Sequence, residues 1–360
     1  MVQKDIKSIV IFYLQMILLW IFAILLFMFF RNYGVEGGAT EKILQGLSPR
    51  QIILINIPVG TVAGIIYASV ELIFESPYFQ KHSYGRIILS KLILFFFVVK
   101  LVMSVGITIT AHFSNLQMEL DELIQILRSK VYWVIFVFFL LVSALISFIR
   151  MVNQKFGPGV LWNMFIGKYR NPREEERVFM FLDLKSSTMI AEKLGHIKFS
   201  RMIQDCFADL TPVVTKHRVE IYQYVGDEAV LSWPLEDGLD NNRCIHCYFD
   251  YMEVLSVRSN YYLKEYGIAP KFKAGVHLGK VIVAEVGLIK REIAYHGDVL
   301  NTTARLQGKC NALKQQLLIS NSLLQYLQPD EKIQSRFLAE ELLRGKKQTV
   351  GIYGVTKNKK

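Results

Sequence analysis

The chain has 360 residues, of which 52% are hydrophobic and 20% are charged, and its formal net charge is +11. This length favours two structural units, and the hydrophobic fraction excludes a disordered or low-complexity protein. The four cysteines are too few for a disulfide-stabilised scaffold. The net charge leaves two classes of partner open, a nucleic acid and an anionic membrane surface.

The two halves of the chain differ in composition. Residues 1–170 contain 15 Lys and Arg against 8 Asp and Glu, whereas residues 171–360 contain 27 against 23. The first half is mostly apolar, and the second half has the mixed charge of a soluble domain. No stretch interleaves Lys and Arg with aromatic residues, so we expect no nucleic-acid partner.

Four apolar stretches in the first half are long enough to cross a bilayer, which takes about 20 residues of helix. They are Ser8–Phe30, Gln51–Glu75, Ile87–Thr110 and Val131–Ile149. A soluble core does not supply four such runs so close together, so we expect a transmembrane domain over residues 1–150, surrounded by membrane lipid. An even number of spans places both termini on one side. The flanking Lys and Arg favour the cytoplasmic side of the cell inner membrane.

Besides the terminal Glu75, three charged residues lie inside these apolar stretches, where a charge is costly and marks a functional candidate. Glu71 and Lys91 lie near the same end of neighbouring spans, at a depth of roughly 6 Å for a rise of 1.5 Å per residue. Two interpretations stay open, an ion pair or separate extension of both side chains to the interface. Lys100 lies deeper, and the sequence assigns it no partner.

A connector is expected over residues 151–172. The glycines and proline of Phe156–Gly159 break any helix that continues from the fourth span. Val160–Tyr169 is expected to form a short helix at the membrane interface. The soluble domain then occupies residues 173–360.

Expected strands and helices alternate in the soluble half without regular strand–helix–strand repetition. This pattern favours an α+β sheet covered by helices on one face. The expected strands are Val178–Leu184, Val219–Tyr224, Ala229–Trp233, Lys271–His277, Lys280–Val286 and Gln348–Val355. The expected helices are Thr188–Thr215 with an interruption near Gly195, Asn241–Tyr266, and Leu300–Cys310.

Two carboxylates occupy the ends of expected strands. Asp183 ends the first strand, and Asp227 lies at the tip of a hairpin. If these strands are neighbours, both carboxylates reach one edge of the sheet, which suits two divalent ions. Magnesium takes few protein carboxylates and completes its shell with substrate phosphate oxygens. The alternative is that both aspartates only form turns.

Asn301 and Arg305 are four residues apart and therefore share one face of an expected helix. An amide and a guanidinium in this arrangement can hold a ribose and a phosphate. The alternative is an ordinary solvated polar face.

Together, four segments resemble the class III nucleotidyl cyclases, and specifically their membrane-bound bacterial members. The segments are Phe181–Thr188, Tyr224–Glu228, Gly275–Gly279 and Gly297–Arg305, and the resemblance covers about Arg173–Val355. It implies a ferredoxin-like cyclase domain that works as a head-to-tail homodimer, with two sites at the dimer interface.

The resemblance also implies roles for individual residues. Asp183 and Asp227, assisted by the Leu184 carbonyl, would bind two Mg²⁺ or Mn²⁺ ions. From the facing subunit, Asn301 would orient the ribose of a purine nucleoside triphosphate, and Arg305 would stabilise the transition state.

The remaining positions match the family less well. Lys346 would contact the triphosphate, on a looser match. Gln223 stands where adenylate-specific members have Lys and guanylate-specific members have Glu, and Ala294 stands where Asp or Thr is usual. We expect a membrane-anchored homodimer that makes cyclic AMP and pyrophosphate from ATP. A guanylate cyclase and a non-catalytic nucleotide-binding or dimerisation module stay open as alternatives.

Overall fold

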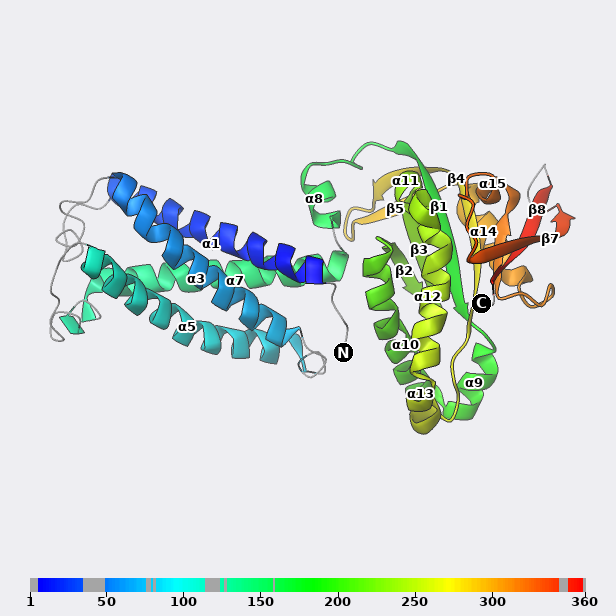
Figure 1. Ribbon diagram of the computed structural model, residues 1–360, viewed down its shortest axis with the longest axis horizontal. Coiled ribbons are helices and arrows are strands. Elements are labelled where there is room, and N and C mark those ends of the chain that lie inside the picture. Colours follow the sequence, from blue (N-terminus) through cyan, green and yellow to red (C-terminus); the bar gives the residue numbers. More distant parts are fainter. Residues whose placement is uncertain are drawn as a thin grey trace. The chain divides into compact units, whose positions relative to one another are not determined.

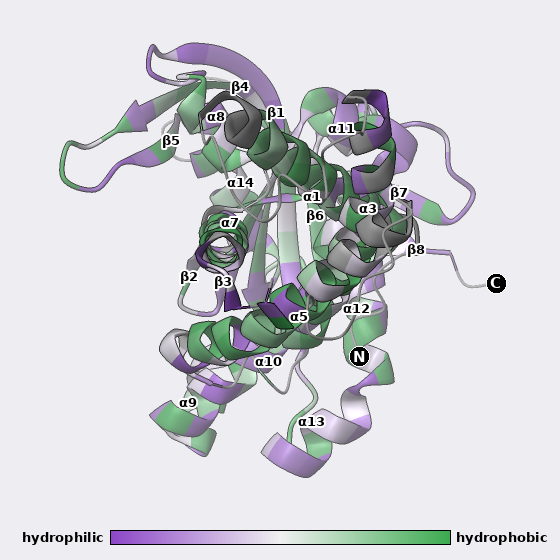
Figure 2. Ribbon diagram, turned by 90° about the vertical axis from the view of Figure 1, so that its left-hand side faces the viewer, coloured by the Kyte–Doolittle hydropathy of each residue, from purple (hydrophilic) through white to green (hydrophobic). Residues whose placement is uncertain are grey.

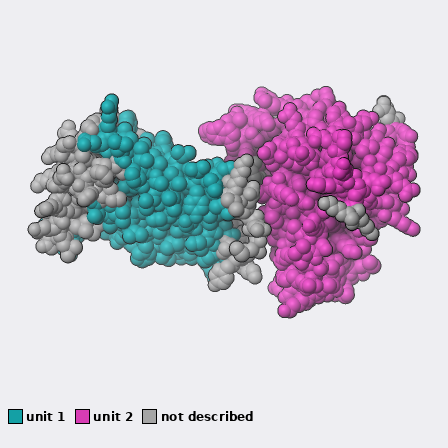
Figure 3. Space-filling model, in the orientation of Figure 1, with its two compact units in different colours: residues 1, 3–155 teal, residues 2, 156–360 magenta. Residues whose placement is uncertain are grey.

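The computed structural model describes residues 6–34, 49–75, 79, 82–113, 124–125, 128–157, 159–342 and 349–358. The chain divides into two compact units, one over residues 3–155 and the other over residues 156–360 (Figure 1 and Figure 3). The domain limits expected from the sequence, with a separate connector at 151–172, stay predictions. The side of the membrane on which each terminus lies also stays a prediction.

Four long helices make up the described part of the first unit: α1 (Ile6–Gly34), α3 (Pro49–Phe74), α5 (Tyr84–Phe113) and α7 (Lys130–Phe156). Each contains a segment long and apolar enough to cross a membrane. Small residues allow close contact between two of them, since a Cβ on Gly64 of α3 would lie 2.5 Å from the Ile17 Cα of α1. The four apolar helices expected from the sequence are confirmed.

A buried polar cluster joins α3, α5 and α7. Glu71, only 1% exposed, accepts hydrogen bonds from Lys91 Nζ at 2.8 Å and from Ser147 Oγ at 2.6 Å. Arg150 Nε lies 3.6 Å from the same carboxylate and also contacts Glu75. The ion-pair interpretation of Glu71 and Lys91 is confirmed, and the cluster contains two cations and two carboxylates.

Lys100 lies among aromatic rings. Its Nζ is 4.7 Å from the ring centroid of Phe96 and 5.3 Å from that of Trp133. The negative faces of these rings stabilise the ammonium group through cation–π interaction. Nothing in the sequence indicated this arrangement.

The second unit is built on a mixed sheet with the strand order β2-β3-β1-β4-β6-β8-β7, and β5 pairs with β4 beside this path. β4 and β6 are parallel, and the other pairs are antiparallel. The strands are β1 (Arg173–Leu184), β2 (Glu220–Val225), β3 (Glu228–Pro234), β4 (Phe272–Val286), β5 (Glu292–His296), β6 (Leu317–Ser320), β7 (Ile333–Glu341) and β8 (Val350–Lys357). The α+β fold class is confirmed.

Helices cover both faces of this sheet (Figure 1). The helices are α8 (Val160–Phe165), α9 (Ser187–Leu194), α10 (His196–Lys216), α11 (Leu235–Leu239), α12 (Arg243–Val257), α13 (Ser259–Tyr266), α14 (Asp298–Lys309) and α15 (Asn321–Leu324). In β1, Met180 and Leu182 join the core formed with α10, α12 and α13, whereas Phe179 and Phe181 join a second core that includes Val299 of α14. The expectation of helices on a single face was therefore wrong for α14.

The expected break at Leu278-Gly279 was also wrong, because β4 is one continuous strand that pairs with β1 through Gly279. A Cβ on Gly279 would lie 2.6 Å from Val299 Cγ2. The absence of a side chain on this glycine leaves room for the side chain of Val299 from α14, and the glycine does not form a turn.

Two further differences concern element boundaries. The helix expected over Asn241–Tyr266 begins at Arg243 and is divided at Arg258 into α12 and α13. The strands β5, β6 and β7 were not expected. β6 has only four residues, and β7 is mostly exposed and contains polar and charged residues, so neither shows a strong apolar alternation.

Candidate functional site

The two predicted metal ligands meet at one end of β1. Asp183 is the penultimate residue of β1, and the antiparallel register places it opposite Glu228 of β3. Asp227 precedes Glu228 in the turn between β2 and β3, where Gly226 has a φ of 62° that favours glycine. Leu184 follows Asp183 as the last residue of β1 and is buried.

Three carboxylates and one lysine set the electrostatics of this end of the sheet. Burial raises the pKa of Asp183, the nearby ammonium of Lys273 opposes the shift, and the charge of Asp227 adds to it. Burial and the charges of Asp183 and Asp227 raise the pKa of Glu228 to about 7. The carboxylates therefore repel one another, and a cation between them would be stabilised.

Two side chains hold the Asp183 carboxylate. Lys273 Nζ lies 3.1 Å from Asp183 Oδ2, and Gln307 Nε2 donates a hydrogen bond of 2.8 Å to the same oxygen. Lys273 faces Asp183 directly across the β1–β4 pair, and Gln307 reaches it from α14. These contacts fix the orientation of the carboxylate.

Asp227 has an unsatisfied oxygen, since its buried Oδ2 has no hydrogen-bond partner. A buried acceptor in this state is costly unless something binds it. The described residues contain no group of three or more His, Cys, Asp and Glu side chains arranged to hold a metal. A carboxylate pair suits ions that take their remaining ligands from substrate phosphates, so the residues present fit Mg²⁺ or Mn²⁺.

Asn301 and Arg305 lie on α14, on a different face from the residues that pack on the sheet. Asn301 is exposed, and Arg305 is half-buried with an Nη1 atom that has no hydrogen-bond partner. Within the described residues, no hydrogen bond or ion pair connects either side chain to Asp183 or Asp227. In a single chain, these two groups of predicted residues stay separate.

The two residues that depart from the family pattern lie in segments that contact each other. Gln223 is an exposed residue of β2, and Ala294 is a half-buried residue of β5. Their chain neighbours Tyr222 and Tyr295 contact each other, with ring centroids 4.8 Å apart. Lys346, the predicted triphosphate contact, lies outside the described residues.

Three residues of the site were not predicted from the sequence. Glu228 directly follows Asp227, and Lys273 opposes Asp183 once the β1–β4 register is known. Gln307 lies on the buried face of α14, where a polar residue among apolar ones signals a specific contact. That signal was present in the sequence, whereas the position of Lys273 required the strand order.

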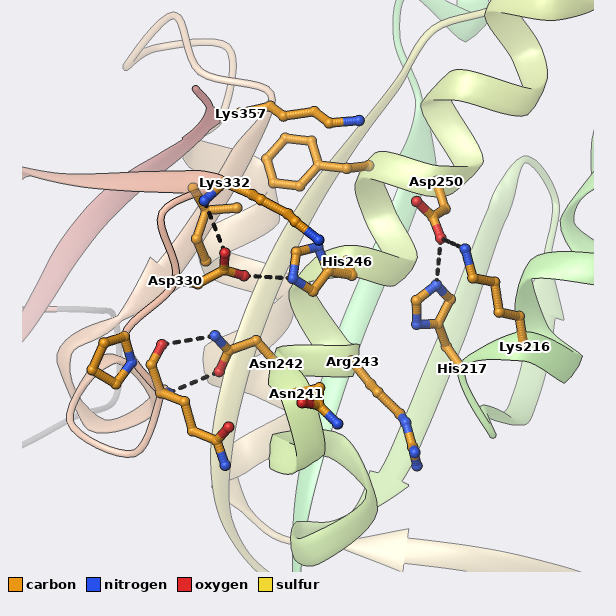
Figure 4. A pocket seen from close by; sticks show the side chains of 14 residues that line it. Lys216, His217, Asn241, Asn242, Arg243, His246, Asp250, Asp330, Lys332 and Lys357 are labelled. Atoms are coloured by element: carbon orange, nitrogen blue, oxygen red, sulfur yellow. Dashed lines mark hydrogen bonds and ion pairs between the residues drawn. The ribbon is translucent and has the colours of Figure 1, made fainter. Parts of the chain in front are cut away.

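A separate polar cavity of about 660 Å³ lies between the end of α10, the start of α12 and residues 328–333 (Figure 4). In it, Asp250 accepts a hydrogen bond of 2.6 Å from Lys216 Nζ and lies 2.8 Å from His217 Nε2. Asp330 lies 2.6 Å from His246 Nε2. The lining also contains Arg243, Lys332 and Lys357, so its cations outnumber its two carboxylates. None of the predicted site residues borders the cavity.

Comparison with known proteins agrees with this geometry. Residues 170–356 match the family model described as the adenylate and guanylate cyclase catalytic domain. Adenylate cyclase 2 of Rhizobium meliloti (strain 1021) is 36% identical over 222 residues, which cover 62% of this chain and 61% of the relative. Guanylate cyclase 2D of Rattus norvegicus is 24% identical over 212 residues, covering 58% of this chain and 19% of the relative.

A solved structure of a bacterial light-regulated adenylyl cyclase shares the fold. It has a TM-score of 0.54 and 18% sequence identity, and the match covers 64% of this chain and 67% of that one. The chain thus spans less than two thirds of the length of the curated relatives it matches.

Proposed function

The chain belongs to the family of adenylate and guanylate cyclase catalytic domains, and from this membership we propose that it is a membrane-anchored adenylate cyclase. It would convert ATP to cyclic AMP and pyrophosphate. The observation that carries the proposal is the pair Asp183 and Asp227 at the end of β1, with a buried Asp227 Oδ2 that lacks a hydrogen-bond partner. Such a pair is suited to hold divalent ions together with a triphosphate.

Asp183, Asp227 and the Leu184 carbonyl would hold two Mg²⁺ or Mn²⁺ ions. When bound, these ions lower the pKa of the ribose 3′-hydroxyl and neutralise charge on the phosphate oxygens. Lys273 and Gln307 keep the Asp183 carboxylate oriented in the absence of substrate. This would keep one proposed metal ligand oriented before the nucleotide arrives.

Arg305 and Asn301 would act from a second copy of the chain. Negative charge grows on the phosphoryl oxygens and on the leaving pyrophosphate, and a guanidinium placed there in advance stabilises it. The unpartnered Nη1 of Arg305 supports this role, because it leaves a donor for a ligand. Asn301, exposed on the same helix face, would orient the ribose.

Membrane anchoring is proposed from the four apolar helices of the first unit. We place the second unit and both termini in the cytoplasm, at the inner membrane, where ATP is available. Anchoring confines two copies to one surface and raises their effective concentration for dimerisation.

The activity is tested with the purified full-length chain in detergent or lipid, supplied with Mn²⁺ and either ATP or GTP. We expect cyclic AMP and pyrophosphate from ATP, and loss of both products with Asp183→Asn or Asp227→Asn. Glu192→Gln, at an exposed position of α9, serves as the control and should keep the activity. Product from GTP alone would assign the guanylate reaction, and nucleotide binding without turnover would support a non-catalytic module.

A second experiment tests the shared site. Asp183→Asn and Arg305→Ala are each expected to be inactive alone. When the two variants are co-expressed, half of the dimers combine them and each such dimer has one intact site of two, so about a quarter of the normal activity should return. If each chain contained its own complete site, co-expression would restore nothing.

A further inference from the structure

The second unit exposes two sets of large apolar side chains. Trp162 and Phe165 of α8 are 64% and 83% exposed, and their rings stack with centroids 5.7 Å apart. Leu288 and Ile289, at the tip of the hairpin between β4 and β5, are 90% and 105% exposed. Figure 2 shows this tip as a hydrophobic end on a hairpin that projects from the sheet. No described residue of the second unit covers these side chains.

The two sets are connected by a structured contact. Tyr169, shortly after α8, is buried against Val281 and Val283 of β4. The Glu285 amide of β4 donates a hydrogen bond of 2.8 Å to the Tyr169 carbonyl. Ile289 follows four residues after Glu285, so the tip lies within about 14 Å of this contact along the chain. The position of α8 and that of the hairpin are therefore coupled.

Chain continuity places α8 close to the bilayer. The apolar segment of α7 ends at Asn153, α7 itself ends at Phe156, and α8 begins at Val160. Four steps of about 3.6 Å allow α8 to start no more than about 15 Å from the end of α7. Trp favours the interface between lipid and water, and Trp and Phe are typical of the apolar face of helices that lie in that interface.

The charges nearby are compatible with lipid head groups. Lys168 and Arg170 follow α8, and Lys290 and Arg291 follow the hairpin tip. Some of these cations contact carboxylates, as the exposed Lys290 does with Glu292. Exposed pairs of this kind are weak, so the cations remain able to attract an anionic surface.

We propose that the second unit docks on the bilayer surface through a membrane-contact patch formed by Trp162, Phe165 and Ile166 of α8 and by Leu288 and Ile289 of the hairpin tip. The apolar side chains insert at the interface and the cations face the head groups. Because the hairpin continues β4, the patch would fix the orientation of the sheet relative to the membrane. This role is separate from the catalytic proposal and does not require turnover.

The test uses a cysteine introduced into the full-length chain. All four native cysteines are buried, so Ile289→Cys can be labelled selectively with a polarity-sensitive fluorophore. The labelled chain is reconstituted in phosphatidylcholine vesicles, with and without phosphatidylserine, and with lipids that carry a quencher at the interface. Val257→Cys, 79% exposed at the end of α12, is the matched control.

We expect a blue-shifted emission at position 289 and quenching by the lipid several-fold stronger than at position 257, with a larger shift in the anionic vesicles. Phe165→Cys provides a second labelled site if the first variant folds poorly, and should behave like Ile289→Cys. Equal quenching at the patch and at the control overturns the proposal. So does cross-linking between two Ile289→Cys chains without lipid quenching, because the patch would then contact a second copy.

Discussion

Replacing Gly275 by alanine tests whether α14 must rest directly on β4. A Cβ at Gly275 would lie 2.4 Å from the backbone nitrogen of Gln307 and 2.7 Å from the carbonyl oxygen of Thr303. Both are backbone atoms of α14, so no side-chain rotation relieves the contact. Ordinary contact begins at 3.4 Å, and the difference from 2.4 Å requires a separation of about 1 Å between the helix and the strand.

This displacement would move two groups of residues of the candidate site. Gln307 holds the Asp183 carboxylate, and Asn301 and Arg305 lie on the same helix. A misplacement of about 1 Å at such groups costs up to about 100-fold in rate, and overpacking costs about 1–3 kcal/mol of stability. We therefore expect Gly275→Ala to lose ten- to about 100-fold in kcat and to unfold at a lower temperature.

The assay measures cyclic AMP formation from Mn²⁺ and ATP, alongside thermal unfolding of the same preparation. Gly308→Ala is the control on the same helix, because a Cβ there meets nothing within 4 Å. It should keep full activity and gain up to about 1 kcal/mol of helix stability. Wild-type kcat in a folded Gly275→Ala variant would show that α14 does not transmit strain to the site, and the reasoning would be refuted.

Two further predictions concern charges outside the site. Glu71→Gln should destabilise the helical bundle by about 3–5 kcal/mol, and by more than Lys91→Met does. Glu71→Gln removes the carboxylate that both Lys91 and Arg150 face and leaves Arg150 with Glu75 alone, whereas Glu71 still contacts Arg150 after the loss of Lys91. Thermal unfolding in detergent measures the ranking, and the reverse order would contradict this reasoning. Burial lowers the pKa of His217 despite a neighbouring carboxylate. The unfolded chain therefore takes up a proton at this imidazole more readily than the folded chain does. The free energy of unfolding should fall as the pH drops below about 6.5. His217→Asn should weaken the dependence of the free energy of unfolding on pH, whereas His196→Asn, at an exposed position, should leave that dependence unchanged. Equal slopes of the free energy of unfolding against pH in the two variants would contradict the role of His217.

The sequence predicted the features that depend on local composition. The four spans follow from runs of apolar residues. The pairing of Glu71 with Lys91 was one of two interpretations that their similar depth in neighbouring spans left open. Asp183 and Asp227 were expected at one edge of the sheet because Asp183 ends a strand and Asp227 lies at the tip of a hairpin. The register of β1 with β3 places the two residues together. In each case the expectation came from the position of a residue within its own segment, and the contact itself depended on which segments are neighbours.

The features that the sequence did not predict depend on packing between distant segments. Gly279 has the composition of a turn, but it lies inside β4 because Val299 of α14 needs the space. Lys273 meets Asp183 only through the antiparallel register of β1 and β4. The ammonium of Lys100 is stabilised by rings from its own helix and from α7, an arrangement that requires the three-dimensional bundle.

Two oppositely charged residues of the candidate site have an unsatisfied atom in the described part of one chain. Asp227 Oδ2 and Arg305 Nη1 are both buried and both lack a hydrogen-bond partner. In the proposed homodimer, ions and a triphosphate bound between two copies would satisfy both groups, so activity should depend on association. A chain that begins at Phe156 should therefore lose specific activity on dilution, whereas the full-length chain, whose membrane helices raise the effective concentration of the second copy, should keep it. Cyclic AMP formation across a dilution series measures this difference, and equal dilution curves for the two chains would show that the helices do not support dimerisation.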